Sequence, residues 1–335
     1  MNIKWGIIFP AVLISLFIGV VCLHADQDSS MSEIRIGNRI LSLDLVLGTG
    51  PKPENRFRFP YSMVVDGTGR IYIADRGNHR IQIFDAEGRF VRTIGGRKRI
   101  GINLTLPKAL ALDDAGNIYI GDYSAERAHL LILDRNGRFL KGIRLPFEAS
   151  QIGYINQQLF IGTKATLSSA NIYLIGPDGR VEGKLEECPP EAALWETRVN
   201  IARAPDGRIF SANEFLPAVR AYSPLGKLEM DFRYKPLTKD YEHPDPSLAG
   251  GIVDEGVHKV LCYDISIDSD GSIYLLVSTD WNDNEKCSLY MFDRTGHFKE
   301  AVDLSFPCSS LRIDASGHFY FLSQMVTGYL YRFGS

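Results

Sequence analysis

The sequence lacks the charge pattern and the metal-ligand spacing that mark several common protein classes. Its formal net charge is -3, so it has no overall basic field of the kind that drives nucleic-acid binding. The dense basic run Arg97–Arg99 is better explained as a solvated loop. Cysteines are few, and those that follow the first segment have no zinc-like spacing: Cys188, Cys262, Cys287 and Cys308. From the net charge we expect no nucleic-acid partner.

Long helical periodicity is also missing after about the first 25 residues. Instead, 31 glycines, an aromatic content of 11% and short β-branched runs predict many short strands joined by tight turns. With 335 residues and a hydrophobic content of 45%, the chain is long enough for one large globular domain or two ordinary ones. This composition favours an all-β protein.

The one long apolar run lies at the N-terminus. Residues 5–23 follow a lysine and precede acidic and polar residues, an order typical of an export signal. The run is longer than most signal cores, yet barely long enough to span a bilayer. We interpret residues 1–25 as a signal peptide or N-terminal membrane anchor, with lipidation at Cys22 as a third alternative, and residues 26–33 as a linker. All three predict a domain outside the cytoplasm: periplasmic, extracellular or anchored to the membrane.

Internal repeats predict the fold. The segment VVDGTGRIYIAD at 64–75 aligns with ALDDAGNIYIGD at 111–122, SIDSDGSIYLLV at 266–277 and RIDASGHFYFLS at 312–323. Two weaker copies lie at 154–164 and 203–213. Each copy has an apolar strand, a turn with Asp and Gly, and a second strand, which is typical of a hairpin. A further turn follows most copies, so the repeating unit has four strands, as in a propeller blade.

The predicted fold is therefore a six-bladed β-propeller of four-stranded antiparallel blades, occupying residues 34–335. The last blade, from about Cys308 to Ser335, contains only three strands. We expect the segment from about Ile36 to Leu47 to supply its fourth strand, which closes the ring and covers an open edge. Residues 237–258 form an insertion between blades 4 and 5.

Residues 58–96, RFPYSMVVDGTGRIYIADRGNHRIQIFDAEGRFVRTIGG, resemble an NHL repeat, including the triplet Asn78, His79 and Arg80. The likeness is strongest in the first blade and weaker along the rest of the chain. Exported bacterial six-bladed propellers are similar throughout, and this resemblance implies binding of a ligand or protein more than a fixed chemistry. Within the triplet's corner, we expect Asp75 to pair with Arg80 or His79.

The candidate binding residues lie on the face that carries the loops between blades and the loops between the second and third strands. A ring of aromatic and charged side chains there could hold an anionic or carbohydrate-like ligand, a peptide or a protein. Polar residues that merely line a wet channel are the alternative. The predicted contacts are Tyr61, Arg76, Lys108, Arg198, Tyr263, Asp264 and Trp281.

Catalysis is the second function class considered, as a metal-assisted hydrolase or lyase with its site at the same mouth. NHL-like amidating lyases place several metal-binding histidines there, whereas His297 and His318 of this chain follow turn glycines on the opposite face. Lactonase-like propellers use a glutamate at the start of the first blade, where this chain has Phe59, Pro60 and Tyr61. No catalytic residue is predicted, no cofactor is expected, and neither calcium nor zinc has a supporting motif.

Cysteine use allows a disulfide in an oxidising compartment. Cys262 and Cys308 occupy equivalent places before the innermost strands of neighbouring blades. We predict a disulfide between these two residues as a hypothesis, while the other pairings remain open.

Overall fold

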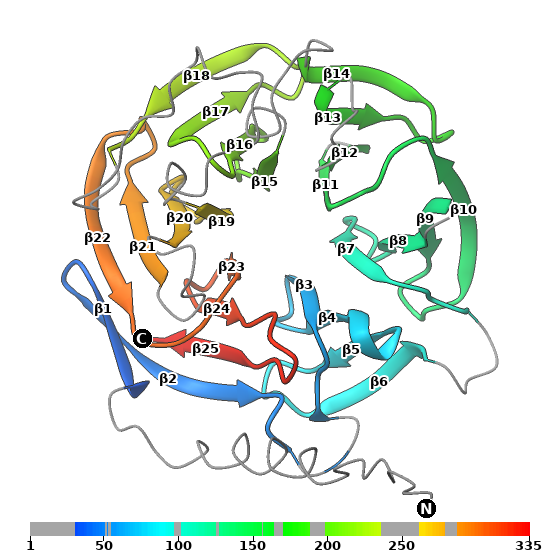
Figure 1. Cartoon of the computed structure of the whole chain (residues 1–335), viewed down its shortest axis with the longest axis horizontal. Helices are drawn as coiled ribbons and strands as arrows, with labels where there is room; N and C mark the ends of the chain where they lie inside the picture. Colours follow the sequence, from blue (N-terminus) through cyan, green and yellow to red (C-terminus); the bar gives the residue numbers. More distant parts are fainter. Residues whose placement is uncertain are drawn as a thin grey trace, which may run out of the picture.

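The computed structural model describes residues 31–335 apart from 51, 53–54, 97–101, 125–126, 156, 164–169, 188–197, 236–260 and 279–286. Six antiparallel sheets form a ring of blades around a central axis (Figure 1). The predicted signal or anchor segment and the insertion at 237–258 lie outside the described residues. No helical segment within the described ranges combines the length and apolarity that a bilayer crossing requires.

Each of the first five blades consists of four consecutive strands, ordered from the axis outwards. Blade 1 contains β3 (Pro60–Val65), β4 (Ile71–Asp75), β5 (Arg80–Phe84) and β6 (Phe90–Gly95), with the short 3-10 helix η3 (Arg76–Asn78) between β4 and β5. Blade 2 contains β7 (Pro107–Leu112), β8 (Ile118–Ser124), β9 (Arg127–Leu133) and β10 (Phe139–Leu145). Blade 3 contains β11 (Gln151–Ile155), β12 (Gln158–Gly162), β13 (Ala170–Ile175) and β14 (Val181–Glu187).

The remaining blades follow the same order. Blade 4 contains β15 (Val199–Arg203), β16 (Ile209–Asn213), β17 (Ala218–Tyr222) and β18 (Leu228–Arg233). Blade 5 contains β19 (Leu261–Ile267), β20 (Ile273–Ser278), β21 (Cys287–Phe292) and β22 (Phe298–Leu304). Blade 6 contains β23 (Ser310–Ile313), β24 (Phe319–Leu322) and β25 (Leu330–Gly334), to which the N-terminal strands β1 (Glu33–Ile36) and β2 (Arg39–Leu47) are added.

The turn between the first two strands of a blade explains the Asp and Gly of the repeat. In blade 1, Asp66 Oδ1 accepts hydrogen bonds from the backbone N–H groups of Thr68 (2.9 Å) and Arg70 (3.0 Å). Gly69 adopts a φ of +79°, which favours glycine. The hydroxyl of Tyr72 donates to the other Asp66 oxygen at 3.3 Å. Equivalent bonds form around Asp113, Asp268 and Asp314.

Ring closure occurs where the sequence predicts it. Strand β2 pairs antiparallel with β25, with Leu43 opposite Phe333 and Leu47 opposite Leu330. The closing strand begins at Arg39, because the chain turns at Gly37 (φ +58°). The preceding strand β1, which was not predicted, pairs with the outer edge of β2. Ile34 of β1 is buried in the cluster between blades 5 and 6, so this extra strand also seals that interface.

The hydrophobic core lies between the blades, since each interface contains one cluster of buried side chains. Between blades 1 and 2, for example, Ile81 and Ile83 pack with Ile118 and Ile120. On the innermost strands, the side chains that face the axis do not belong to these clusters. Those positions are therefore available for polar side chains.

The closing strand offers a direct test of ring closure. Leu41 is fully buried in the cluster between blades 5 and 6, whereas its neighbour Ile40 is 46% exposed. We expect Leu41→Ala to lower the free energy of unfolding by about 2–5 kcal/mol, because it leaves a cavity in that interface. Ile40→Ala is the matched control and should change the same free energy by less than about 0.5 kcal/mol. Urea unfolding followed by circular dichroism measures both, and equal effects of the two variants would contradict a closing role for β2.

Candidate functional site

Two cavities lie along the propeller axis, one at each end of the innermost strands. The mouth cavity, of about 550 Å³, is lined by residues from the connections between blades and from loops such as Ser323–Val326. The turn-side cavity, of about 760 Å³, is lined by the first turn of several blades. Arg312 lines both cavities.

Four of the predicted binding residues meet in the mouth cavity: Tyr61, Arg198, Tyr263 and Asp264 all line it. They come from blades 1, 4 and 5: Arg198 directly precedes β15, Tyr61 is the second residue of β3, and Tyr263 and Asp264 lie in the first half of β19. Burial raises the pKa of the Tyr263 hydroxyl. The structure brings these residues together, while their contact with a ligand remains a prediction.

Two further predicted residues lie beside Tyr61 and do not line the mouth cavity itself. The Arg76 guanidinium carbon and the Lys108 ammonium nitrogen each lie 5.7 Å from the centroid of the Tyr61 ring, within cation–π range. Lys108 also forms an ion pair with Glu148 and lies 5.0 Å from the ring centroid of Tyr123. Arg76 and Lys108 thus hold the Tyr61 ring at the cavity's edge. Trp281, the seventh predicted contact, lies outside the described residues.

Asp264 is a positioning residue in this geometry. It is almost fully buried, and its Oδ2 accepts hydrogen bonds from Ser310 Oγ (2.7 Å), Leu311 N (2.9 Å) and Arg312 Nη1 (2.7 Å). Its Oδ1 accepts from Ile265 N (3.0 Å). Because both oxygens already have partners, the carboxylate joins blades 5 and 6 and shapes the cavity wall.

Polar residues occupy equivalent positions of four innermost strands, and we call this set the polar belt: Gln151, Asn200, Asp264 and Ser310. Of these residues, only Asp264 was predicted from the sequence. Gln151 Nε2 donates to Asn200 Oδ1 at 3.0 Å, and Asn200 Nδ2 donates to the carbonyl of Cys262 at 2.6 Å. The belt therefore links blades 3 to 6 across their inner edges. Aligning the innermost strands by the repeat would have revealed it, since the same position is polar in successive blades.

The mouth cavity also contains buried polar atoms whose hydrogen-bonding capacity is not used. Ser323 is almost fully buried, and its Oγ has no hydrogen-bond partner among the described residues. Arg198 Nε lies 3.0 Å from Glu214 Oε2 in an ion pair, yet makes no hydrogen bond within the described part of the chain. Buried polar groups are nearly always hydrogen-bonded, so Ser323 and Arg198 point to a ligand or ordered water in this cavity.

The Asn-His-Arg corner of blade 1 has a structural role. Asp75 is fully buried, and it accepts hydrogen bonds from Arg80 Nε (2.8 Å), Asn78 Nδ2 (2.8 Å) and Arg58 N (2.7 Å). The predicted pairing of Asp75 with Arg80 is confirmed. Burial raises the pKa of the Asp75 carboxyl, and these donors oppose that effect by stabilising its charged form. This corner fixes the start of the blade and does not face the mouth cavity.

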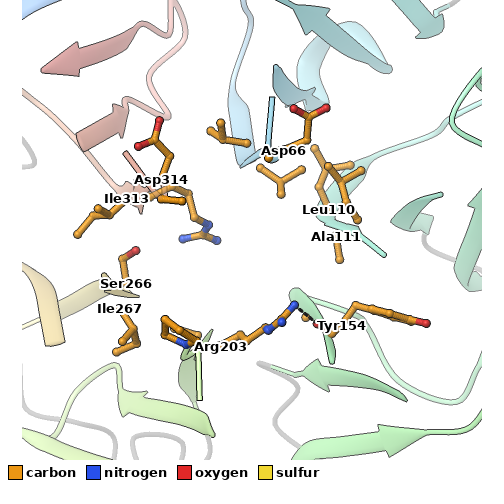
Figure 2. A pocket seen from close by; sticks show the side chains of 18 of the residues that line it. Asp66, Leu110, Ala111, Tyr154, Arg203, Ser266, Ile267, Ile313 and Asp314 are labelled. Carbon is orange, nitrogen blue, oxygen red and sulfur yellow. Dashed lines mark hydrogen bonds between the residues drawn. The ribbon is translucent and has the colours of Figure 1, made fainter. Parts of the chain in front are cut away.

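Figure 2 shows the turn-side cavity. Its wall combines apolar side chains such as Leu110 and Ile267 with the carboxylates Asp66 and Asp314 of the turns. Arg203 extends across one side and donates to the carbonyl of Tyr154 at 3.2 Å. These carboxylates already accept hydrogen bonds within their own turns, so fewer polar groups of this cavity are available for other hydrogen bonds.

The cysteines do not adopt the predicted pairing. Cys308 carries a buried thiol in the structure and packs in the cluster between blades 5 and 6. Cys262 packs in the cluster between blades 4 and 5. Equivalent residues of successive blades each face the preceding blade, so the body of blade 5 separates Cys262 from Cys308. Their equivalence in the repeat therefore does not make them neighbours.

Among the described residues, no three His, Cys, Asp or Glu side chains are arranged to hold a metal ion. His243 and His258, which the insertion carries, lie outside the described ranges.

Comparisons with known proteins agree with the repeat and the fold. Residues 57–84 match the NHL repeat family. The human NHL repeat-containing protein 3 is 50% identical over 40 residues, which are 12% of this chain and 11% of that protein. The matched stretch thus spans about a tenth of the relative's length, and the similarity concerns the repeat. The chain is a six-bladed propeller whose first blade contains an NHL repeat.

Solved structures resemble the chain over most of its length at low identity. A candidate exported protein from Bacteroides fragilis is 11% identical, with a TM-score of 0.62, covering 87% of this chain and 94% of that one. A streptogramin B lyase is 14% identical, with a TM-score of 0.54, covering 91% of this chain and 88% of that one. At such identities the likeness shows the fold alone.

The role of Asp264 can be tested through stability. We expect Asp264→Ala to lower the free energy of unfolding by at least about 2 kcal/mol, because it leaves buried donors and Arg312 without their acceptor. The matched control is Asp231→Ala, which removes an exposed pair with Arg220 and should cost less than about 1 kcal/mol. Urea unfolding of both variants measures the difference. A fully stable Asp264→Ala protein would show that the carboxylate does not join the blades.

Proposed function

We propose that this protein is a binding module that holds a small, uncharged, hydroxyl-rich ligand, such as a carbohydrate, in the mouth cavity. The observation that carries the proposal is the pair of buried polar groups there, Ser323 Oγ and Arg198 Nε, whose hydrogen-bonding capacity is unused within the described residues. A ligand hydroxyl can both donate and accept, so it can satisfy both groups. The volume of about 550 Å³ lies within the range of small-molecule sites.

Charge balance supports an uncharged ligand over an anion. The charged residues that line the mouth cavity form two pairs, Arg198 with Glu214 at 3.0 Å and Arg312 with Asp264 at 2.7 Å. Each arginine is thus compensated before a ligand arrives. An anion would compete with these carboxylates, whereas a neutral ligand can use the remaining hydrogen-bonding positions.

The other lining groups suit the same ligand class. The side chains of Tyr61 and Tyr263 provide flat apolar surfaces with a hydroxyl, and Gln324 provides an amide. The Gln324 amide is held by its hydrogen bond to the carbonyl of Tyr61 at 2.9 Å. A mixture of aromatic faces and fixed polar groups orients a ligand that has both apolar C–H surfaces and hydroxyls.

Action outside the cytoplasm is part of the proposal. The N-terminal apolar run supports it, as does the description of the similar Bacteroides fragilis protein as a candidate exported protein. In that location the ligand would be met in the cell envelope or its surroundings.

Ser323→Ala separates ligand binding from folding. Because Ser323 Oγ has no hydrogen-bond partner among the described residues, its removal should leave the free energy of unfolding almost unchanged. We expect the same change to weaken ligand binding by about three- to tenfold through loss of one hydrogen bond. Ser310→Ala is the matched control, since its hydroxyl donates to Asp264 and its loss should lower stability.

The measurement is isothermal titration of the purified full chain with maltotriose, cellotriose, xylotriose and trigalacturonate. The proposal expects at least one neutral trisaccharide to bind, and the acidic one to bind more weakly. Failure of all four to bind at millimolar concentration would contradict a carbohydrate ligand. Preferential binding of trigalacturonate would contradict the argument from charge balance, and Ser323→Ala with unchanged affinity would place the site elsewhere.

A further inference from the structure

A pair of buried cysteines lies beside the mouth cavity. Cys287 begins β21 in blade 5, and Cys308 lies just before β23 in blade 6. The Cys287 thiol donates to the carbonyl oxygen of Cys308, with a sulfur–oxygen distance of 2.9 Å. The two side chains belong to the same hydrophobic cluster, which fills the interface between these blades. Cys308 also lines the mouth cavity.

We propose that Cys287 and Cys308 form a disulfide when the chain folds in an oxidising environment, and that this bond links blade 5 to blade 6. Both side chains pack in one interface, and the Cys287 sulfur contacts Cys308 directly, so folding brings these two residues together. The bond would close a loop over residues 288–307, which includes β22 and the connection between the two blades. The proposal does not depend on the identity of the ligand.

The chemistry is thiol–disulfide exchange with an external disulfide, either a small molecule or an oxidoreductase. The thiolate of one cysteine attacks the external disulfide, which forms a mixed disulfide and releases one thiol. The thiolate of the other cysteine then attacks the mixed disulfide, forms the internal bond and releases a second thiol. The two protons that the cysteines lose are taken up through solvent by the two released thiolates, so the external disulfide is reduced to two thiols.

The burial of both cysteines determines when the disulfide can form during folding. Cys287 is 2% exposed and Cys308 is 3% exposed, so an external disulfide cannot reach either sulfur in the folded protein. Burial and the neighbouring Cys287 also raise the pKa of the Cys308 thiol well above its ordinary value, which leaves little reactive thiolate. The bond must therefore form before the interface between blades 5 and 6 closes. The same burial then protects it from reductants.

The bond would stabilise the wall of the mouth cavity. Cys308 is followed directly by Ser309 and Ser310, which line that cavity, and Ser310 donates to Asp264. Fixing Cys308 against blade 5 restricts the segment that leads into β23. The link therefore holds the polar belt at the junction of blades 5 and 6, close to the point where the N-terminal strands complete the ring.

Peptide mapping tests the proposal directly, because trypsin cleavage separates all four candidate cysteines. The expected peptides are 185–198 with Cys188, 260–286 with Cys262, 287–294 with Cys287 and 300–312 with Cys308. The full chain is unfolded with reductant, refolded in a buffer of reduced and oxidised glutathione, alkylated with iodoacetamide and digested. Mass spectrometry without reductant should find 287–294 linked to 300–312, with 260–286 alkylated.

Thermal unfolding provides the second readout. In the oxidised protein, Cys308→Ser should lower the melting temperature by roughly 5–10 °C more than it does when both proteins are kept reduced. The control Cys262→Ser should give the same shift under both conditions. The proposal is overturned if 287–294 and 300–312 are both alkylated after oxidative refolding, or if either is linked to another peptide.

Discussion

The pairing of β2 with β25 is the interaction on which the remaining geometry depends. These strands come from opposite ends of the described chain, and their hydrogen bonds turn an open row of six sheets into a ring. Only a closed ring places β23 next to β3 and surrounds the axis with innermost strands (Figure 1). Closure also sets the outer packing, because Leu45 of β2 occupies the space into which a Cβ at Gly88 would project. The mouth cavity is therefore a product of the closing strand as much as of its own lining residues.

Much of the fold could be predicted because the same local interactions recur in several blades of a propeller. The Asp and Gly of each first turn have the same physical task in several blades, and the missing fourth strand of blade 6 required a partner from elsewhere. Strand β1 could not be predicted in the same way. The alternation of Ile34 and Ile36 continues into the following strand, and only the turn at Gly37 and burial against blade 5 distinguish a hairpin from one long strand.

The site was predictable in position but not in its interactions. Repeats indicate where each innermost strand begins, which was enough to identify Tyr61, Arg198 and Tyr263 as neighbours around one cavity. The partners of these side chains come from loops and blades that lie far apart in sequence, such as Glu214 for Arg198. Asp264 illustrates the limit, since its residue type suggests a ligand contact while its burial and hydrogen bonds show a link between blades. Pairing in space, and not residue type, decides the role of such a residue.

The alternation of the innermost strands explains how one segment can serve both stability and binding. Along β23, Leu311 is buried in the interface between blades, while the flanking Ser310 and Arg312 line the mouth cavity. The apolar positions are constrained by packing, whereas the axis-facing positions need only satisfy their own polar groups. In blades 3 to 6 those positions largely satisfy one another through the polar belt, whereas Ser323 and the Arg198–Glu214 pair line the mouth cavity outside the belt. Binding chemistry in this propeller is therefore expected to vary through the loops that carry Glu214 and Ser323, while the belt below them preserves the ring.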